Sequence, residues 1–340
     1  MLPISALPGT TILDLTRLLP GPMATQWLAD MGATVIKVEE PGAGDSMRSM
    51  PPEGLFEQIN RGKKSVAVDL KSTEGLAAFL RLSEKADVLI EGFRPGVMNR
   101  LGCGWNVLRQ RNPRLVYVAL TGYGSESPYK DLAGHDINYL AMAGVLDLIG
   151  PAKGAPVIPG VQIADLAGGS MYAVIGVLSA LLARQRTGEG CFVDISMTHG
   201  SAKLLPIPLA QLRSGEPPRR GNEILSGRYA CYNLYRTADG RYVAVGALEP
   251  KFWAALCRAL GCEQFIEDQF AEGARREEIL NAVGAHFVSR GAEEWFTTLR
   301  HLDTCVTPVR TVAEAAADLG LVAKGGVAPR LGEHSGELLK

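Results

Sequence analysis

The sequence of 340 residues lacks several features that would place it in a familiar class of protein. It has no excess of either charge, because 35 Lys and Arg residues are balanced by 36 Asp and Glu residues. A protein whose main partner is a nucleic acid or an anionic membrane usually carries a basic patch, so neither partner is expected. Residues 1–10 lack the basic and apolar regions of a signal peptide, and a cytoplasmic location is predicted.

The cysteines and the apolar stretches exclude further classes. None of the six cysteines belongs to a CxxC pair with a matching second pair, so neither a zinc site nor a disulfide framework is indicated. Free thiols in a reducing compartment are the expected state, and no metal site is predicted. One uncharged stretch, 166–183, is barely long enough to span a bilayer and contains several Gly and Ser residues. We therefore predict that it forms a buried helix.

Strand-like and helix-like segments alternate over the first 200 residues. Helices are expected at 22–31 and 73–86. Short strands are expected at 12–15, 34–38, 65–70, 88–90, 115–120 and 191–196. This alternation predicts an α/β fold with a doubly wound, Rossmann-like parallel sheet. Ligands of such sheets bind at the carboxyl ends of the strands.

The pattern changes after residue 200. A proline-rich segment, 201–224, is predicted to be a linker. Strand-like segments at 229–235 and 242–246 flank Asp239-Gly240, which is typical of a hairpin. Helical patterns follow at 250–260, 276–290 and 292–302. We predict a large domain over 1–200, a smaller α+β domain over 225–315, and a return of 316–340 to the large domain.

The first βαβ unit is similar to the start of a dinucleotide-binding domain. Glu39 lies near the position of an acid that would bind a ribose. The turn at 18–22 reads LLPGP, however, which is not GxGxxG, and Pro22 removes an amide that a pyrophosphate would use. NAD is therefore disfavoured, and a purely structural βαβ unit is the better interpretation.

Cationic side chains gather at two predicted strand ends. Arg61, Lys63 and Lys64 precede the third strand, and Arg94 follows the fourth. Arg and Lys at such an edge suit the phosphates of a ligand. A solvated basic face is the better interpretation for any single residue, but two clusters at neighbouring strand ends favour a phosphorylated ligand.

Three titratable residues stand in distinctive contexts. His135 lies in the run GHDINY, Asp165 precedes the uncharged stretch, and Glu249 lies between a strand and a helix. Each has a structural alternative, namely a hydrogen-bonded structural histidine, a helix N-cap and a helix-start acid. A histidine and a carboxylate are also the minimum needed to move a proton onto and off carbon near neutral pH.

The helix expected to begin at Asp165 would offer two further properties. Its first amides could stabilise negative charge on a substrate oxygen. Gly168 and Gly169 would let a substrate approach the backbone closely. A capping role and a catalytic role for Asp165 are therefore compatible.

The chain resembles the family III CoA-transferase superfamily, also called the CaiB/BaiF family. The matching segments are DLTR at 14–17, GP at 21–22, LADMGA at 28–33, VIKVE at 35–39, and the segments 60–71 and 86–96. The resemblance implies a CoA thioester ligand with no separate cofactor. It also implies an interlocked homodimer whose active site lies between the large domain of one chain and the small domain of the other.

Two chemistries occur on this scaffold. Transferases use an Asp as the nucleophile and pass through an acyl-enzyme anhydride, whereas racemases of the α-methylacyl-CoA type use a His and an Asp to exchange the α-proton. Asp165 occupies the position that both share, so it does not decide between them. His135 in GHDINY matches the racemase pattern, as do GGSM at 168–171 and VGALEP at 245–250. In racemases the residue matching Glu249 supports the histidine, while Ile163-Ala164 departs from the usual Val-Gly.

The resemblance therefore predicts a racemase that interconverts (R)- and (S)-2-methylacyl-CoA by 1,1-proton transfer through an enolate. A CoA-transferase and a non-catalytic acyl-CoA binding protein are the alternatives. His135, Asp165 and Glu249 are the predicted catalytic residues. The predicted contacts to the CoA thioester are Lys37, Arg61, Ala67, Arg94, Tyr139, Gly168 and Gly169.

Overall fold

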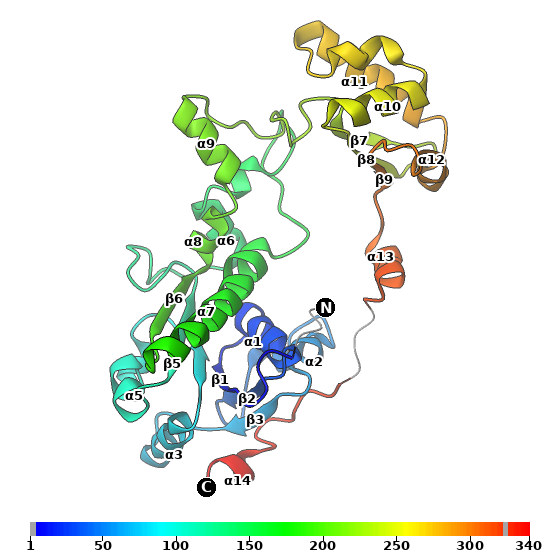
Figure 1. Cartoon of the computed structure of the whole chain (residues 1–340). Helices are drawn as coiled ribbons and strands as arrows, with labels where there is room; N and C mark the ends of the chain where they lie inside the picture. The colour runs from blue at the N-terminus through cyan, green and yellow to red at the C-terminus, as the bar shows by residue number, and fades with distance from the viewer. Residues whose placement is uncertain (1–4, 322–325) are drawn as a thin grey trace. The chain divides into compact units, whose positions relative to one another are not determined.

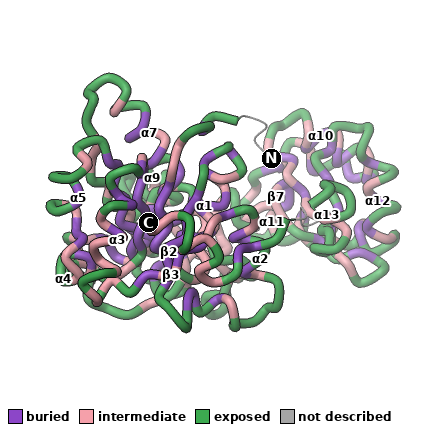
Figure 2. The backbone as a smooth tube through the Cα atoms, turned by 90° about the horizontal axis from the view of Figure 1, so that it is seen from below, coloured by how far each residue is buried: buried purple, intermediate pink, exposed green. Residues whose placement is uncertain are grey.

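The structure is a computed structural model that describes residues 5–321 and 326–340. The described chain forms two compact units (Figure 1). Unit 1 comprises 5–146, 158–209 and 326–340, and unit 2 comprises 147–157 and 210–321. Figure 2 shows that each unit has its own buried interior.

A six-stranded parallel sheet forms the centre of unit 1. Its strands lie in the order β3-β2-β1-β4-β5-β6. The strands are β1 (Thr11–Leu15), β2 (Thr34–Glu39), β3 (Lys64–Ala67), β4 (Val88–Glu91), β5 (Val116–Thr121) and β6 (Phe192–Ser196). From β1 the chain adds β2 and then β3 on one side of the sheet, and it then crosses back to add β4, β5 and β6 on the other side of β1. The predicted doubly wound sheet is confirmed, and its switch point lies between β1 and β4.

Helices cover both faces of this sheet. They are α1 (Pro20–Asp30), α2 (Leu55–Asn60), α3 (Thr73–Glu84), α4 (Val97–Arg100), α5 (Trp105–Arg111), α6 (Asp136–Met142), α7 (Tyr172–Thr187), α8 (Met197–Ala202) and α14 (Ser335–Leu338). Two short 3-10 helices are η1 (Ser46–Arg48) and η2 (Leu146–Leu148). A π-helix, η3 (Ala164–Met171), leads directly into α7. Side chains alternate between the two faces along each strand. Leu13 and Leu15 join Phe79 of α3 and Leu108 of α5 in one core, whereas α1 and α7 pack on the opposite face.

Unit 2 is built on an antiparallel sheet of three strands. These are β7 (Tyr232–Arg236), β8 (Tyr242–Gly246) and β9 (Val306–Pro308). Its helices are α10 (Pro250–Leu260), η4 (Glu263–Asp268), α11 (Gly273–Phe287), α12 (Ala292–Leu299) and α13 (Val312–Leu319). The β7–β8 hairpin turns at Gly240 in the left-handed region, with φ of 77°, as the Asp-Gly pair predicts. Trp253, Phe287 and Trp295 fill the core, so the predicted small α+β fold is confirmed.

The predicted linker at 201–224 is only partly correct. It contains the end of α8 and all of helix α9 (Pro206–Ser214). Pro206 and Pro208 lie in the first turn of α9, where the missing N–H groups have no intrahelical partner to lose. Proline content alone therefore misidentified a helix start as a linker.

The uncharged stretch forms a helix, but it is not fully buried as predicted. Residues 164–187 are apolar and long enough to cross a membrane by length and composition, and 44% of the most apolar window is buried. One face packs on β5 and β6. Met171, Ile175 and Leu182 recur along the other face and are exposed. The helix therefore has an apolar face without a partner among the described residues of unit 1.

Small residues let α8 cross the π-helix η3 at unusually short range. A Cβ on Gly200 would lie 2.0 Å from the carbonyl oxygen of Gly168, and a Cβ on Gly168 would lie 2.5 Å from the Oγ of Ser201. Gly169 is buried against the side chain of Met197. Gly168 and Gly169 thus serve packing between two helices, and their contact with a substrate stays a prediction.

This crossing predicts a large effect of a single added methyl group. Gly200→Ala should lower the free energy of unfolding by about 3 kcal/mol, because the obstacle is a backbone carbonyl that cannot move without shifting η3. Urea unfolding at neutral pH measures the change. Gly336→Ala in α14 is the matched control, since nothing lies within 4 Å of its added Cβ. An equal effect of the two substitutions would contradict the proposed close crossing.

Candidate active site

A cavity of about 630 Å³ opens in unit 1 at the switch point of the sheet. Residues 16–21 line it after β1, residues 92–95 after β4 and residues 120–123 after β5. The remaining wall includes His135, Tyr139, Asp165 and Met197. The cavity therefore lies at the carboxyl ends of the strands, where doubly wound sheets bind their ligands.

The run GHDINY folds into the turn that begins α6. His135 is the N-cap residue, and its N–H donates to the Oδ1 of Asn138 over 3.1 Å. Tyr139 is buried, and its hydroxyl donates to the carbonyl oxygen of Gly134. These bonds hold the backbone on both sides of His135, which is exposed at the cavity wall.

Asp165 lies in the first turn of η3 and is not its N-cap as predicted. Ile163 takes the N-cap position and makes no side-chain cap. The Oδ1 of Asp136 accepts from the N–H of Asp165 over 2.9 Å, so a carboxylate on α6 supplies the missing cap. That amide is therefore occupied, and a contact of the other amides in this turn with a substrate oxygen stays a prediction. The same bond ties Asp165 to the residue beside His135.

The surroundings of Asp165 change its acidity. Burial and the neighbouring charge of Asp136 raise the pKa of Asp165 from 3.8 to about 7. Burial and the charge of Asp165 also raise the pKa of Tyr139 to about 12, with Arg94 partly opposing the shift. A pKa in this range suits a group that exchanges protons near neutral pH.

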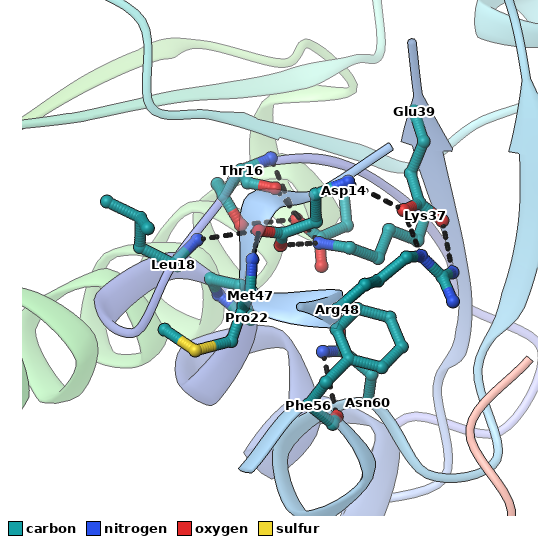
Figure 3. Close-up of polar contacts among 12 residues, drawn as sticks. Asp14, Thr16, Leu18, Pro22, Lys37, Glu39, Met47, Arg48, Phe56 and Asn60 are labelled. Atoms are coloured by element: carbon teal, nitrogen blue, oxygen red, sulfur yellow. Dashed lines mark hydrogen bonds and ion pairs between the residues drawn. The ribbon is translucent and has the colours of Figure 1, made fainter. Parts of the chain in front are cut away.

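Lys37 does not reach the cavity, and its prediction as a phosphate anchor is wrong. Its side chain is fully buried beneath the loop that follows β1 (Figure 3). The Nζ lies 2.9 Å from the Oδ2 of Asp45 and donates to the carbonyl oxygen of Thr16 over 3.0 Å. Ile36 and Val38 face the core with α3, so strand alternation turns Lys37 toward the opposite, equally buried face.

The other predicted CoA contacts are distributed unevenly. Arg94 and Tyr139 line the cavity. Arg61 lies outside it, where its guanidinium binds both carboxylate oxygens of Asp30 at 2.8 and 2.6 Å. The N–H of Ala67 donates to the Oγ of Ser335 over 2.9 Å. Contacts of Arg61 and Ala67 with a ligand stay predictions.

Sequence reasoning did not single out Arg17. This side chain lines the main cavity and also a second cavity of about 160 Å³ beside it. Phe93 is shared by the two cavities in the same way, and the guanidinium of Arg17 lies 5.5 Å from the centre of its ring. The position of Arg17 directly after the first strand was the signal that could have found it, because that strand end opens on the switch point.

Glu249 belongs to unit 2. It is the exposed N-cap residue of α10, and Pro250 occupies the first turn of that helix. It therefore lies at the start of a helix, as the structural alternative predicts, although its carboxylate makes no cap bond. A role for Glu249 as the partner of His135 stays a prediction.

Comparison with known proteins identifies the class of protein to which this arrangement belongs. The family model described as CoA-transferase family III matches residues 7–338, and the chain therefore belongs to that family. It is 38% identical to the human α-methylacyl-CoA racemase over 317 residues, which cover 91% of this chain and 79% of the relative. It is 32% identical to the mouse succinyl-CoA:glutarate CoA-transferase over 330 residues, with coverages of 94% and 75%. A solved CaiB/BaiF family protein from Brucella suis superposes with a TM-score of 0.84 at 29% identity, covering 98% of this chain and 99% of that one.

The raised pKa of Asp165 predicts a pH-dependent effect of Asp165→Asn on stability. The protonated wild-type carboxyl contributes stability at acid pH, and this contribution is lost as the pH rises through about 7. Relative to wild type, the variant should therefore gain roughly 2 kcal/mol between pH 4.5 and pH 8, less than the full pKa difference because the side chain keeps some solvent contact. Urea unfolding at the two pH values measures it. Asp131→Asn, at an exposed carboxylate, is the control, and a pH-independent difference for Asp165→Asn would contradict the assignment.

Proposed function

We propose that the protein is a racemase that interconverts (R)- and (S)-2-methylacyl-CoA thioesters. The observation that carries the proposal is one cavity lined by both His135 and a carboxyl, Asp165, with a pKa of about 7. The bond from the N–H of Asp165 to Asp136 links the two segments directly. Racemisation requires two groups that exchange protons with the same carbon atom, and this cavity offers two.

The proposed mechanism follows from the protonation states of these groups. One group, in its basic form, removes the α-proton of the thioester, which leaves an enolate whose charge rests largely on the thioester oxygen. The other group, in its acid form, returns a proton to the opposite face, and exchanging the roles serves the other enantiomer. The N–H of Asp136, next to His135, has no hydrogen-bond partner among the described residues and is available to the thioester oxygen. His135 and Asp165 then share the chemistry without a separate cofactor.

The two cavities share Arg17 and Phe93, and we assign the two ends of a CoA thioester to them. We assign the acyl end to the larger cavity, beside His135 and Asp165. Arg17 and Arg94 offer positive charge to the phosphates between this end and the nucleotide. The smaller cavity, lined by apolar side chains such as Val38 and Val68, would then accept the adenine. Binding energy from this remote part of the substrate positions the small reacting centre.

A CoA-transferase is the second candidate, because transferases in the same family resemble the chain almost as closely as racemases do. In that chemistry Asp165 would attack the thioester carbonyl and form an anhydride. The attack needs an ionised carboxylate and has no use for His135. The raised pKa of Asp165 and the histidine that lines the same cavity favour proton transfer. A non-catalytic acyl-CoA binding protein would need neither.

Deuterium incorporation tests the reaction itself. In deuterated water, either enantiomer of a 2-methylacyl-CoA should lose its stereochemical purity and gain one deuterium at the α-carbon. Mass spectrometry and chiral analysis follow both changes. Transfer of CoA to an added carboxylic acid without α-exchange would establish the transferase instead. CoA binding with neither reaction across a panel of acyl groups would establish the binding protein.

His135→Ala separates the two chemistries within one protein. The rate of α-proton exchange should fall by about 10³-fold, the range expected for losing a general acid–base group. Any CoA transfer that depends on Asp165 should persist. His301→Ala, at an exposed histidine of unit 2, is the control. An unchanged exchange rate in His135→Ala would remove this residue from the mechanism.

We also infer that the protein is an interlocked homodimer, as the family resemblance implies. The exposed apolar side chains Met171, Ile175 and Leu182 support a second copy against the 164–187 helix. Replacing Ile175 and Leu182 by Glu should convert the dimer to a species of half the mass in sedimentation. Replacement of the exposed Arg186 by Glu is the control at the end of the same helix. A monomeric wild-type protein would contradict the inference.

A further inference from the structure

Four charged side chains are buried beneath the loop that joins β1 to α1. Asp14, Lys37, Asp45 and Lys63 are at most 3% exposed. The Nζ of Lys37 lies 2.9 Å from the Oδ2 of Asp45, and the Nζ of Lys63 lies 3.2 Å from the Oδ2 of Asp14 (Figure 3). Apart from Lys37, the Oδ2 of Asp45 has no partner among the residues that the structure describes. Burying a charge this deeply lowers the stability of the fold unless the charge is paired, so we expect these four side chains to have a role beyond stability.

Their remaining bonds converge on the backbone of the loop. The Nζ of Lys37 donates to the carbonyl oxygen of Thr16, and the Oδ1 of Asp45 accepts from the N–H of Leu18 over 3.1 Å. The Oδ1 of Asp14 accepts from both the N–H and the hydroxyl of Thr16. Three buried charges therefore fix the N–H and carbonyl of Thr16 and the N–H of Leu18, in a segment that lines the main cavity.

The held conformation is one that the loop would not adopt by itself. Leu18 has φ of 64°, in the left-handed region that residues with a Cβ seldom occupy. The bond from its N–H to Asp45 is made in that conformation. The ion pair of Asp45 with Lys37 thus stabilises a loop geometry that local preferences oppose.

The loop is connected in turn to the segment that carries Asp165. The Oγ of Ser170 in η3 lies 2.6 Å from the carbonyl oxygen of Pro20 and 3.0 Å from that of Asp165, and its one proton is shared between these two acceptors. Pro20 ends the loop and begins α1. A displacement of the loop would therefore be transmitted to the backbone of Asp165 as well as to the cavity wall.

We propose that Lys37 and Asp45 are positioning residues that hold the Thr16–Leu18 backbone in the geometry required by the adjacent cavity. They act through the loop and contact no substrate. This role in turnover rests on the proposed function, whereas the role in ordering the loop does not. It also explains why Lys37 resembles a phosphate ligand in the sequence while lying beneath the site.

Two charge-neutral double variants separate positioning from stability. Lys37→Met/Asp45→Asn removes both charges but keeps an oxygen for the N–H of Leu18, whereas Lys37→Met/Asp45→Leu removes that oxygen too. Both avoid the unpaired buried charge that a single substitution leaves, so we expect Tm values within a few degrees of each other. The Leu variant should show faster amide deuterium exchange in 15–21 and about 100-fold lower kcat/KM for a 2-methylacyl-CoA. The Asn variant should retain at least a tenth of wild-type kcat/KM.

Arg184→Met/Asp87→Asn is the matched control. This ion pair, at 2.9 Å, lies at the amino end of β4, far along the strand from the cavity residues that follow Glu91. It should leave exchange in 15–21 and kcat/KM unchanged. Wild-type loop exchange and wild-type kcat/KM in a folded Lys37→Met/Asp45→Leu variant would overturn the proposal.

Two further measurements keep the test independent of folding and of the reaction. If the Leu variant does not fold, Lys37→Met/Asp45→Ala, which also removes both charges and the oxygen for the N–H of Leu18, takes its place, with faster loop exchange supporting the proposal and unchanged exchange refuting it. If the wild-type protein catalyses neither α-exchange nor CoA transfer, loop exchange and calorimetric affinity for CoA replace kcat/KM. Unchanged values of both in the Leu variant would then refute the positioning role. Failure of the racemase assignment alone would still leave loop exchange faster and CoA affinity lower in the Leu variant than in wild type.

Discussion

The burial of paired charges under the first loop is the constraint on which the rest of unit 1 depends. Asp14 and Lys37 occupy neighbouring strands at paired positions, so the sheet itself brings opposite charges together in a dry environment. Burial opposes ionisation of Asp14, yet Lys37, Lys63 and two hydroxyls hold its pKa well below the ordinary value. The resulting charges are satisfied only if the loop backbone supplies the remaining partners. The geometry of the cavity is thereby coupled to the interior of the sheet.

Much of the fold follows from patterns that local physics enforces. Alternation of short apolar strands with helices predicts the doubly wound sheet, and Asp239-Gly240 predicts the hairpin of unit 2, because few other structures satisfy those backbone preferences. Pro206 and Pro208 led to the wrong prediction of a linker, because proline occurs both where regular secondary structure is interrupted and in the first turn of a helix. Which of the two occurs depends on the packing of the residues that follow, and this is a tertiary property.

The sequence predicted the titratable residues of the candidate site, but it did not correctly predict which cation would bind the phosphates of a ligand. His135 and Asp165 both line the cavity, because each lies at the start of a helix close to the switch point of the sheet. Lys37 was misassigned because a cation at a strand end looks the same in sequence whether it faces a ligand or a buried carboxylate. Its partner Asp45 is eight residues away across a Gly-rich loop, and no local pattern reports that contact.

The hydrogen bond from the N–H of Asp165 to the carboxylate of Asp136 shows how helix packing can set the acidity of a side chain. If Asp165 had capped its own helix, the amide hydrogen bonds would have favoured the ionised form and a low pKa. The carboxylate of Asp165 is instead partly buried, and the carboxylate of Asp136, which accepts from the backbone N–H of Asp165, places a negative charge beside it. Both changes favour the protonated form. A second carboxylate on the adjacent helix, placed next to His135, can thus shift the acidity of Asp165 toward the range in which protons are exchanged near neutral pH.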